Sequence, residues 1–274
     1  MPGGEDRYEE FDPPASLRPW VRRIWTYAAP QPSATPQRIA PDGCPELVVD
    51  IGSPYEELGE DGAWRLQPTA IFAGQMTRPL AIRPIGPVEL VAVRFEPDGA
   101  RDWLKRPLLE ATDKRLDVAD RLSGLGLAAG DAAAQVGAIA AWLEAARIRD
   151  GWTVDAVVRA EVEAAQAETA PAARSAAEQR ALQRRFQDRV GVSPRTLRSV
   201  FRFRRVFDHA AEHDPAAAGW LEAGLSAGYF DQPQMARDFR RFLGCTATEW
   251  AREQMELARR IASQSYKPEL PHLT

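Results

Sequence analysis

The stretch that most constrains the fold of this chain runs from Ala181 to Pro194 and reads A-L-Q-R-R-F-Q-D-R-V-G-V-S-P. On a helix, Leu182, Phe186 and Val190 fall four residues apart and form one buried stripe. The opposite face carries long planar polar side chains and no carboxylate, from Arg180, Gln183, Arg184 and Gln187. Two interpretations of that face stay open, a solvated surface helix and a helix that reads base edges in the major groove of DNA.

The residues that follow predict a sharp boundary and a second helix. Gly191 ends the first helix, Ser193 can cap the next one, and Pro194 fits a first helical turn, where no backbone N–H is needed. The helix that begins here should extend over residues 193–212 and connect two helical units.

A second stretch of the same kind spans residues 228–244 and reads G-Y-F-D-Q-P-Q-M-A-R-D-F-R-R-F-L-G. Asp231 and Gln234 form a capping pair, and Pro233 lies in the first turn. The helix buries Met235, Phe239 and Phe242, while Gln232, Gln234, Arg237 and Arg241 lie elsewhere on its circumference. A short apolar helix containing Trp220, Leu221 and Leu225 precedes the bend at Gly228, which is the pattern of a helix-turn-helix.

Charge is distributed unevenly along the chain. The net charge is −4, yet between residues 174 and 205 ten arginines are opposed only by Glu178 and Asp188, which leaves a local balance of +8. The ten are Arg174, Arg180, Arg184, Arg185, Arg189, Arg195, Arg198, Arg202, Arg204 and Arg205. Such asymmetry indicates a local nucleic-acid footprint, and arginine suits bidentate contacts to guanine or phosphate.

These motifs together resemble the DNA-binding domain of AraC-type transcription regulators over residues 153–258. The matching strings are A-L-Q-R-R-F with V-G-V-S-P, and G-Y-F-D-Q with R-D-F-R-R-F-L-G. The resemblance implies base reading by Arg180, Gln183, Arg184, Gln232, Gln234 and Arg237. It implies phosphate contacts by Arg185, Arg195, Arg198, Arg202, Arg240 and Arg241. The two recognition helices would then occupy successive major grooves, about 34 Å apart.

The segment A-E-T-A-P-A-A-R-S-A-A-E, residues 167–178, departs from that family. The first helix of the first helix-turn-helix is shortened to an alanine-rich remnant, which Pro171 interrupts. Ser175 and Glu178 still form a capping box that starts the recognition helix. We therefore expect the first half of the domain to contribute less sequence specificity than the second.

The sequence of the N-terminal half predicts short strands separated by glycine and proline turns, as in a small antiparallel barrel or jelly roll. Residues 1–15 are expected to be poorly ordered. The predicted strands are Arg18–Tyr27, Glu46–Ile51, Trp64–Gln67, Ala70–Gly74, Leu80–Pro84 and Val88–Phe95. The strings P-D-G-C-P-E-L-V, A-G-Q-M-T-R-P-L and V-A-V-R-F-E-P-D-G-A are similar to the cupin-like sensory domain that precedes this DNA-binding domain in many family members.

Helical patterns follow the strands. We expect helices at residues 98–105 and 108–122, the second with loop character, and a linker at residues 123–130. Asp131 should cap a helix whose apolar positions are Val136, Ile139, Leu143 and Ala146, and this helix either packs on its own domain or forms a dimer contact. Thr153 should cap the next helix, with Val154, Val157, Val158 and Val162 buried.

The predicted fold class is α+β with two domains. A small antiparallel β barrel or jelly roll with helices precedes an all-α tandem helix-turn-helix. The expected boundaries are a sensor domain at residues 1–125, a linker and helix at 126–152, the DNA-binding domain at 153–260 and a tail at 261–274. Arginines line one face of the helix of residues 193–212. Three roles stay open for this face: exposure to solvent, contact with DNA phosphate, or contact with the acidic sensor domain.

Function classes can also be narrowed. A cupin-type metalloenzyme is the rival interpretation, but residues 1–208 contain no histidine, so we expect no catalytic residues, no metal and no cofactor. Cys44 and Cys245 lack metal-ligand spacing and are expected to be reduced structural thiols. The N-terminal residues lack an apolar signal region and no run approaches ~20 apolar residues, which predicts a cytoplasmic protein without a membrane partner.

The leading hypothesis is a sequence-specific transcription regulator that binds double-stranded DNA and responds, through its N-terminal domain, to a small-molecule effector whose binding residues the sequence does not identify. RNA polymerase and a second copy of the chain, forming a homodimer, are further partners compatible with the resemblance. The alternative is a protein-interaction or adaptor module descended from such a regulator, with weakened DNA binding, which the degenerate segment before Ser175 motivates.

Overall fold

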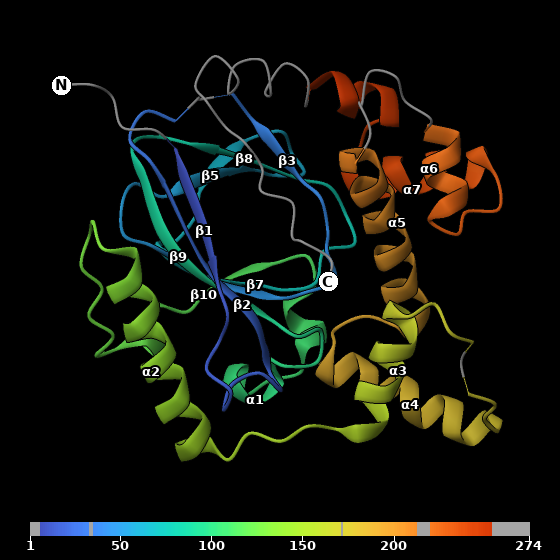
Figure 1. Cartoon of the computed structure of the whole chain (residues 1–274), viewed down its shortest axis with the longest axis horizontal. Helices are drawn as coiled ribbons and strands as arrows, with labels where there is room; N and C mark the ends of the chain where they lie inside the picture. Colours follow the sequence, from blue (N-terminus) through green and yellow to red (C-terminus); the bar gives the residue numbers. More distant parts are fainter. Residues whose placement is uncertain (1–5, 33–34, 171, 213–219, 254–274) are drawn as a thin grey trace.

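The computed structural model describes residues 6–32, 35–170, 172–212 and 220–253. Two parts lie side by side: antiparallel sheets built by the first half of the chain, and a group of helices built by its C-terminal part (Figure 1). The tail expected at residues 261–274 lies outside the described residues.

Ten strands form two antiparallel sheets within the described residues. In spatial order, the six-stranded sheet contains β1 (Arg7–Phe11), β2 (Val21–Ala29), β9 (Val88–Phe95), β4 (Glu46–Asp50), β7 (Ala70–Ala73) and β10 (Arg115–Asp117). The four-stranded sheet contains β3 (Gln37–Ile39), β8 (Leu80–Pro84), β5 (Tyr55–Leu58) and β6 (Trp64–Leu66). The expected small barrel is therefore present as two facing antiparallel sheets.

Alternation along β9 explains how the layers pack. Val91 and Val93 point to one face and join a core with the helices that cover the large sheet. Leu90 and Ala92 point to the other face and join a second cluster with Tyr55 of the small sheet. Since side chains alternate along a strand, one sequence supplies both cores.

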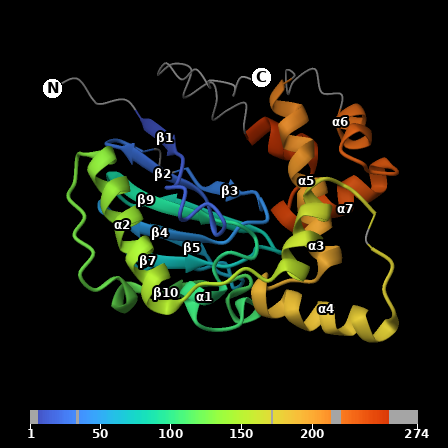
Figure 2. The same cartoon turned by 60° about the horizontal axis from the view of Figure 1, so that its bottom comes forward.

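The helices of the first half cover the outer face of the large sheet. They are α1 (Arg101–Leu104), the 3-10 turns η1 (Leu108–Ala111) and η2 (Ala119–Leu122), and α2 (Ala132–Asp150). Asp131 caps α2 by accepting a hydrogen bond from the backbone of Ala134 at 3.0 Å, as predicted. Ile139 and Leu143 are fully buried, so α2 packs on its own domain (Figure 2).

In the C-terminal part, the regular elements among the described residues are all helices. Its elements are α3 (Ala156–Gln166), α4 (Ala176–Arg189), α5 (Pro194–Glu212), α6 (Trp220–Ser226) and α7 (Gln232–Leu243). Leu197 and Phe201 of α5 pack with α3 and α4, whereas Phe203 and Val206 pack with α7. The connecting helix thus belongs to two cores, as its sequence predicts.

Several local predictions were wrong. Residues 7–11 form strand β1 rather than a poorly ordered segment, because the whole strand pairs in register with β2. Asp155, not Thr153, caps α3, and its carboxylate accepts the N–H groups of Val157 and Val158 at 3.1 Å. Residues 108–122 form two 3-10 turns around β10 instead of one helix.

Two valines predicted to be buried are also exposed. Val154 and Val157 lie before and in the first turn of α3, on the side away from the core that contains Val158 and Val162. The helix begins after a cap at Asp155 rather than after Thr153. This later start places Val154 before the helix and turns Val157 away from the core.

Asp50, in the domain formed by the two sheets (the sheet domain), should make the stability of the protein depend on pH. Burial raises the pKa of Asp50 to about 7, and its Oδ1 is buried without a hydrogen-bond partner. The folded state therefore holds a proton that the unfolded chain releases, so this residue makes stability fall as pH rises from about 4 through 7.

We expect Asp50→Asn to stabilise the protein by about 2 kcal/mol at pH 8 and to have little effect at pH 4. Urea unfolding at both pH values measures this difference, and Asp120→Asn, at an exposed position, is the matched control. An unchanged pH dependence in the Asp50 variant would contradict the assignment.

Candidate nucleic-acid interface

The first candidate reading surface lies on α4. Leu182 and Phe186 are buried against α3 and α5, so the helix is fixed along one stripe. Arg180, Gln183 and Arg184 are all exposed on its other faces. The expected polar face is therefore accessible along the helix.

A capping box fixes the start of α4. The Ser175 side chain accepts a hydrogen bond from the backbone N–H of Glu178 at 3.3 Å, while the Glu178 carboxylate accepts from the backbone N–H of Ser175 at 2.8 Å. Hydrogen bonds from Ser175 hold the pKa of Glu178 below its usual value. The negative charge of Glu178 at this helix end also interacts favourably with the partial positive charge of the backbone N–H groups.

The second candidate surface lies on α7. Asp231 caps the helix by accepting from Gln234 N at 2.7 Å, and Met235, Phe239 and Phe242 are buried. The outward side chains in this part of the chain include Gln232, Arg237, Arg240 and Arg241.

Gln234 lies differently from the other predicted reading residues. Its Oε1 accepts a hydrogen bond from the backbone N–H of Phe230 at 3.1 Å, and the residue is partly buried. Gln234 thus completes the cap at the start of α7. Phe230 is 89% exposed just before this helix, and no sequence pattern predicted this exposure.

The predicted phosphate-contact arginines fall into two groups. Arg195, Arg240 and Arg241 are exposed. Arg185 is exposed on α4, where its Nε donates to Asp155 at 2.8 Å. Burial pushes the pKa of Asp155 up, but hydrogen bonds from Arg185 and from the backbone outweigh it, and the pKa lies below its usual value.

Arg198 and Arg202 instead make contacts inside the helical domain. Arg198 donates to Glu161 at 2.9 Å and to the carbonyl of Thr169 at 2.8 Å. Arg202 donates to Asp238 at 3.1 Å and lies over the ring of Tyr229 at 4.6 Å. These contacts connect α5 to α3 and to α7, and the phosphate role expected for both residues stays a prediction.

The segment between α3 and α4 contains no helix in its described residues, 167–170 and 172–175. Arg174 and Arg198 both pair with the Glu161 carboxylate, each at 2.9 Å, and the Glu161 side chain is only 3% exposed. The expected short first helix is thus absent from these residues, and an ion triad attaches the segment to α3.

The sheet domain contacts both halves of the helical domain. Arg101 of α1 pairs with Asp188 of α4 at 2.8 Å, and Thr112 donates to the Gly191 carbonyl at 2.7 Å. At the other end, Arg38 of β3 donates to the Leu243 carbonyl at 2.9 Å. The sequence contained no signal for these contacts, because each joins residues at least 79 positions apart.

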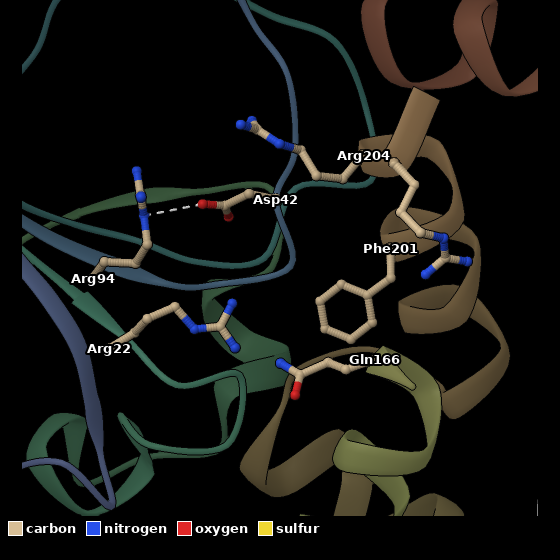
Figure 3. Close-up of a pocket in the computed structure, with 7 residues that line it drawn as sticks. Arg22, Asp42, Arg94, Gln166, Phe201 and Arg204 are labelled. Atoms are coloured by element: carbon tan, nitrogen blue, oxygen red, sulfur yellow. Dashed lines mark ion pairs between the residues drawn. The ribbon is translucent and has the colours of Figure 1, made fainter. Parts of the chain in front are cut away.

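A crevice of about 430 Å³ lies between these contacts (Figure 3). Arg22, Asp42 and Arg94 line it from the sheet domain, and Gln166, Phe201, Arg204 and Arg205 line it from the helices. Figure 3 shows the Arg22 guanidinium, the Gln166 amide and the Phe201 ring facing the same space.

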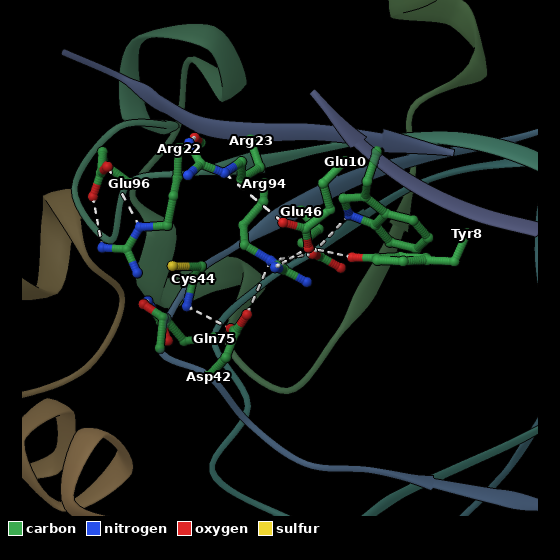
Figure 4. A network of polar contacts seen from close by, with 12 residues as sticks. Tyr8, Glu10, Arg22, Arg23, Asp42, Cys44, Glu46, Gln75, Arg94 and Glu96 are labelled. Atoms are coloured by element: carbon green, nitrogen blue, oxygen red, sulfur yellow. Dashed lines mark hydrogen bonds and ion pairs between the residues drawn. The ribbon is translucent and has the colours of Figure 1, made fainter. Parts of the chain in front are cut away.

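A polar network behind the crevice positions its arginines (Figure 4). Arg94 pairs with Glu46 at 2.8 Å and with Asp42 at 3.0 Å, and Arg22 pairs with Glu96 at 2.8 Å. Burial raises the pKa of the neighbouring Cys44 thiol well above its usual value. Cys44 and Cys245 are both free and buried, in agreement with the structural role predicted for them.

Two further properties concern the described ranges as a whole. Among these residues, no group of histidine, cysteine, aspartate or glutamate side chains could hold a metal ion. Every helix found there is too short or too polar to cross a lipid bilayer.

Comparison with known proteins gives matches for both halves of the chain. Residues 9–117 match a family described as a domain of unknown function (DUF6597), and residues 172–253 match a helix-turn-helix domain family. No curated protein matches the chain.

Two solved structures illustrate the structural similarities. The crystal structure of ToxT from Vibrio cholerae O395 gives a TM-score of 0.44 at 8% identity, over 83% of this chain and 96% of that chain. A Cupin_2 domain of an XRE family transcriptional regulator from Enterobacter cloacae gives 0.24 at 20% identity, over 33% of this chain and 96% of that chain.

Proposed function

We propose that this chain, an AraC-type helix-turn-helix protein with a cupin-like N-terminal domain, regulates transcription by binding a specific double-stranded DNA site through α4 and α7. One observation carries the proposal. Two helices with exposed arginine and glutamine side chains are packed near opposite ends of the connecting helix α5 (Figure 1).

The dimensions support simultaneous binding of both helices. At about 1.5 Å per residue, the 19 residues of α5 span roughly 28 Å. Successive major grooves on one face of B-form DNA are about 34 Å apart. Each recognition helix can enter a groove about 12 Å wide with its buried stripe facing the protein.

The proposed roles follow from side-chain exposure. Arg180, Gln183 and Arg184 read bases from α4, and Gln232 and Arg237 read bases from α7. Gln234 orders the start of α7. Phosphate contacts come from Arg185, Arg195, Arg240 and Arg241, which lie on exposed surfaces of the same domain.

In this role the chain acts as a binding protein rather than as an enzyme. Its sensor domain responds to a small-molecule effector and alters the access of RNA polymerase to a promoter, and two copies can bind adjacent sites. The protein acts in the cytoplasm, where it meets the DNA.

A gel-shift titration tests the proposal. The full chain is titrated with the promoter of its own gene and with a scrambled DNA of the same length and composition, at several salt concentrations. We expect at least 10³-fold tighter binding to the specific DNA at physiological salt.

An adaptor module is the second candidate, because no helix precedes α4 in the described part of the segment that joins it to α3. Equal affinities for the promoter and scrambled DNA would favour the adaptor and contradict sequence-specific regulation.

A further inference from the structure

Phe230 is the most exposed large apolar side chain among the residues that the structure describes. It lies two residues before α7 and is 89% exposed. Single exposed apolar side chains are common on protein surfaces, so exposure alone assigns no role to this one. The contacts and the position of Phe230 carry the argument further.

The Phe230 ring does not pack on the helix that follows it. Asp231 is the N-cap of α7, so Phe230 is the residue before the cap and Met235 is the fourth residue of the helix. Apolar side chains at these two positions often pack together and fix the entry of the chain into a helix. Here Met235 is buried in the core between α5 and α7, whereas the ring of Phe230 remains almost entirely in solvent. The fold therefore makes little use of the ring.

Hydrogen bonds nevertheless fix the backbone on both sides of Phe230. Its own N–H donates to Oε1 of Gln234 at 3.1 Å, and the Asp231 side chain accepts from the backbone N–H of Gln234 at 2.7 Å. Tyr229, on the other side, is buried, and its hydroxyl donates to Asp238 at 2.9 Å. The ring thus projects from an anchored turn. Because only two side-chain torsions remain to be fixed, its burial by a partner costs little conformational entropy.

This turn lies at the end of α7 that would enter DNA. In a helix-turn-helix, the N-terminal residues of the second helix contact base edges in the major groove. Gln232 and Arg237 are exposed on α7 beyond the turn. Leu225, at the end of α6, is 53% exposed and lines the same small depression as Gln232. The end of the helix therefore presents apolar as well as polar side chains.

We propose that Phe230 contacts the 5-methyl group of a thymine in the DNA block read by α7 and adds specificity for a T·A pair. Thymine carries the only methyl group on the base edges of the major groove, and phenylalanine is among the side chains that contact it. Cytosine instead presents an amino group there, which the ring would leave without a hydrogen-bond partner. This contact rests on the proposed function, because Phe230 meets a base only if α7 enters the groove.

Deoxyuridine, which differs from thymidine only by the missing methyl group, tests the contact. The full chain first selects its site from a random double-stranded pool, and the block that Arg237→Ala relaxes is assigned to α7. Each thymine of that block is then replaced singly by deoxyuridine, and affinity is measured by gel-shift titration at one salt concentration. We expect one of these replacements to weaken binding about three- to five-fold, as burial of a single methyl group predicts.

Phe230→Ala should weaken binding to the unmodified site about five-fold or more, and it should abolish the effect of that replacement. Because the ring is exposed, the variant should unfold in urea as the wild type does. Ile148→Ala is the matched control, since Ile148 is 70% exposed on α2 in the sheet domain. This control should keep the wild-type affinity and the full dependence on the methyl group.

Failure of this contact can be told apart from failure of the proposed function. Recovery of no enriched sequence would contradict the proposed function and the thymine contact together. An enriched site whose α7 block lacks thymine, or a Phe230→Ala variant that keeps the deoxyuridine effect, would overturn the thymine contact alone. Unchanged DNA affinity of that variant, with loss of transcription by added RNA polymerase, would also overturn it and would assign the ring to a protein partner.

Discussion

Replacing Glu161 with glutamine should lower the free energy of unfolding by about 3 kcal/mol. The Glu161 carboxylate is almost completely buried and pairs with Arg174 and Arg198. Loss of its charge leaves two guanidinium groups facing a neutral amide, and removing one partner from a buried ion pair typically costs about 3 to 5 kcal/mol.

The same substitution should loosen the segment before α4. Arg174 lies in that segment, and Arg198 also donates to the carbonyl of Thr169 within it. Hydrogen exchange at residues 167–175 should therefore increase together with the loss of stability measured by urea unfolding. Glu163→Gln is the control, because Glu163 is exposed on the same helix. A change below about 0.5 kcal/mol for Glu161→Gln would contradict the structural role of the triad.

Arg237→Ala should weaken binding to the specific DNA by about 1 to 3 kcal/mol and relax the preference at one base position. Arg237 is exposed on α7, whose other side is fixed by Met235 and Phe239 in the core. Affinity for scrambled DNA should change little, because a base contact carries the sequence information.

Arg184→Ala should reduce base discrimination less than Arg237→Ala. The first turns of α4 are exposed, and the described residues before it contain no supporting helix, so the orientation of this helix is less restricted. Affinities of both variants for single-base variants of the site measure the difference. Arg149→Ala, an exposed arginine of α2 in the sheet domain, serves as the control. Equal or greater loss of discrimination at the Arg184 position would contradict the unequal roles.

Patterns of period two and near four predicted many of the elements. Leu80–Pro84 and Val88–Phe95 are strands over the predicted residues, and the alternating apolar side chains of Val88–Phe95 join two cores. Helices α4 and α7 were predictable from apolar spacing and from the caps at Ser175 and Asp231.

Elements that depend on distant pairing were not predictable in the same way. Strand β1 is acidic and half-exposed, and β2 is what orders it. Strand β10 was not predicted, because it is too short to show a pattern in the sequence and forms only three residue pairs with β7. Both are edge strands of the large sheet, where few side chains need to be apolar.

Arginines with similar positions in the sequence also differ in their exposure and contacts. Arg195 and Arg198 lie one helical turn apart by sequence, yet only Arg198 meets Glu161 across the packed α3–α5 contact. The sequence shows that arginines are abundant here, but it does not show which residues they pair with. Glu161, the partner of Arg174 and Arg198, lies 13 and 37 residues away from them in sequence. The interdomain crevice has the same origin, because its lining combines residues between positions 22 and 205.

One chain should read two adjacent segments of DNA, one through α4 and one through α7. Selection of bound fragments from a random double-stranded pool, followed by sequencing, would reveal both segments. We expect an enriched site with two conserved blocks whose centres lie about 10 base pairs apart, with Arg237→Ala relaxing one block and Arg184→Ala the other. Recovery of DNA with no enriched sequence, or of a single block unaffected by either substitution, would contradict it.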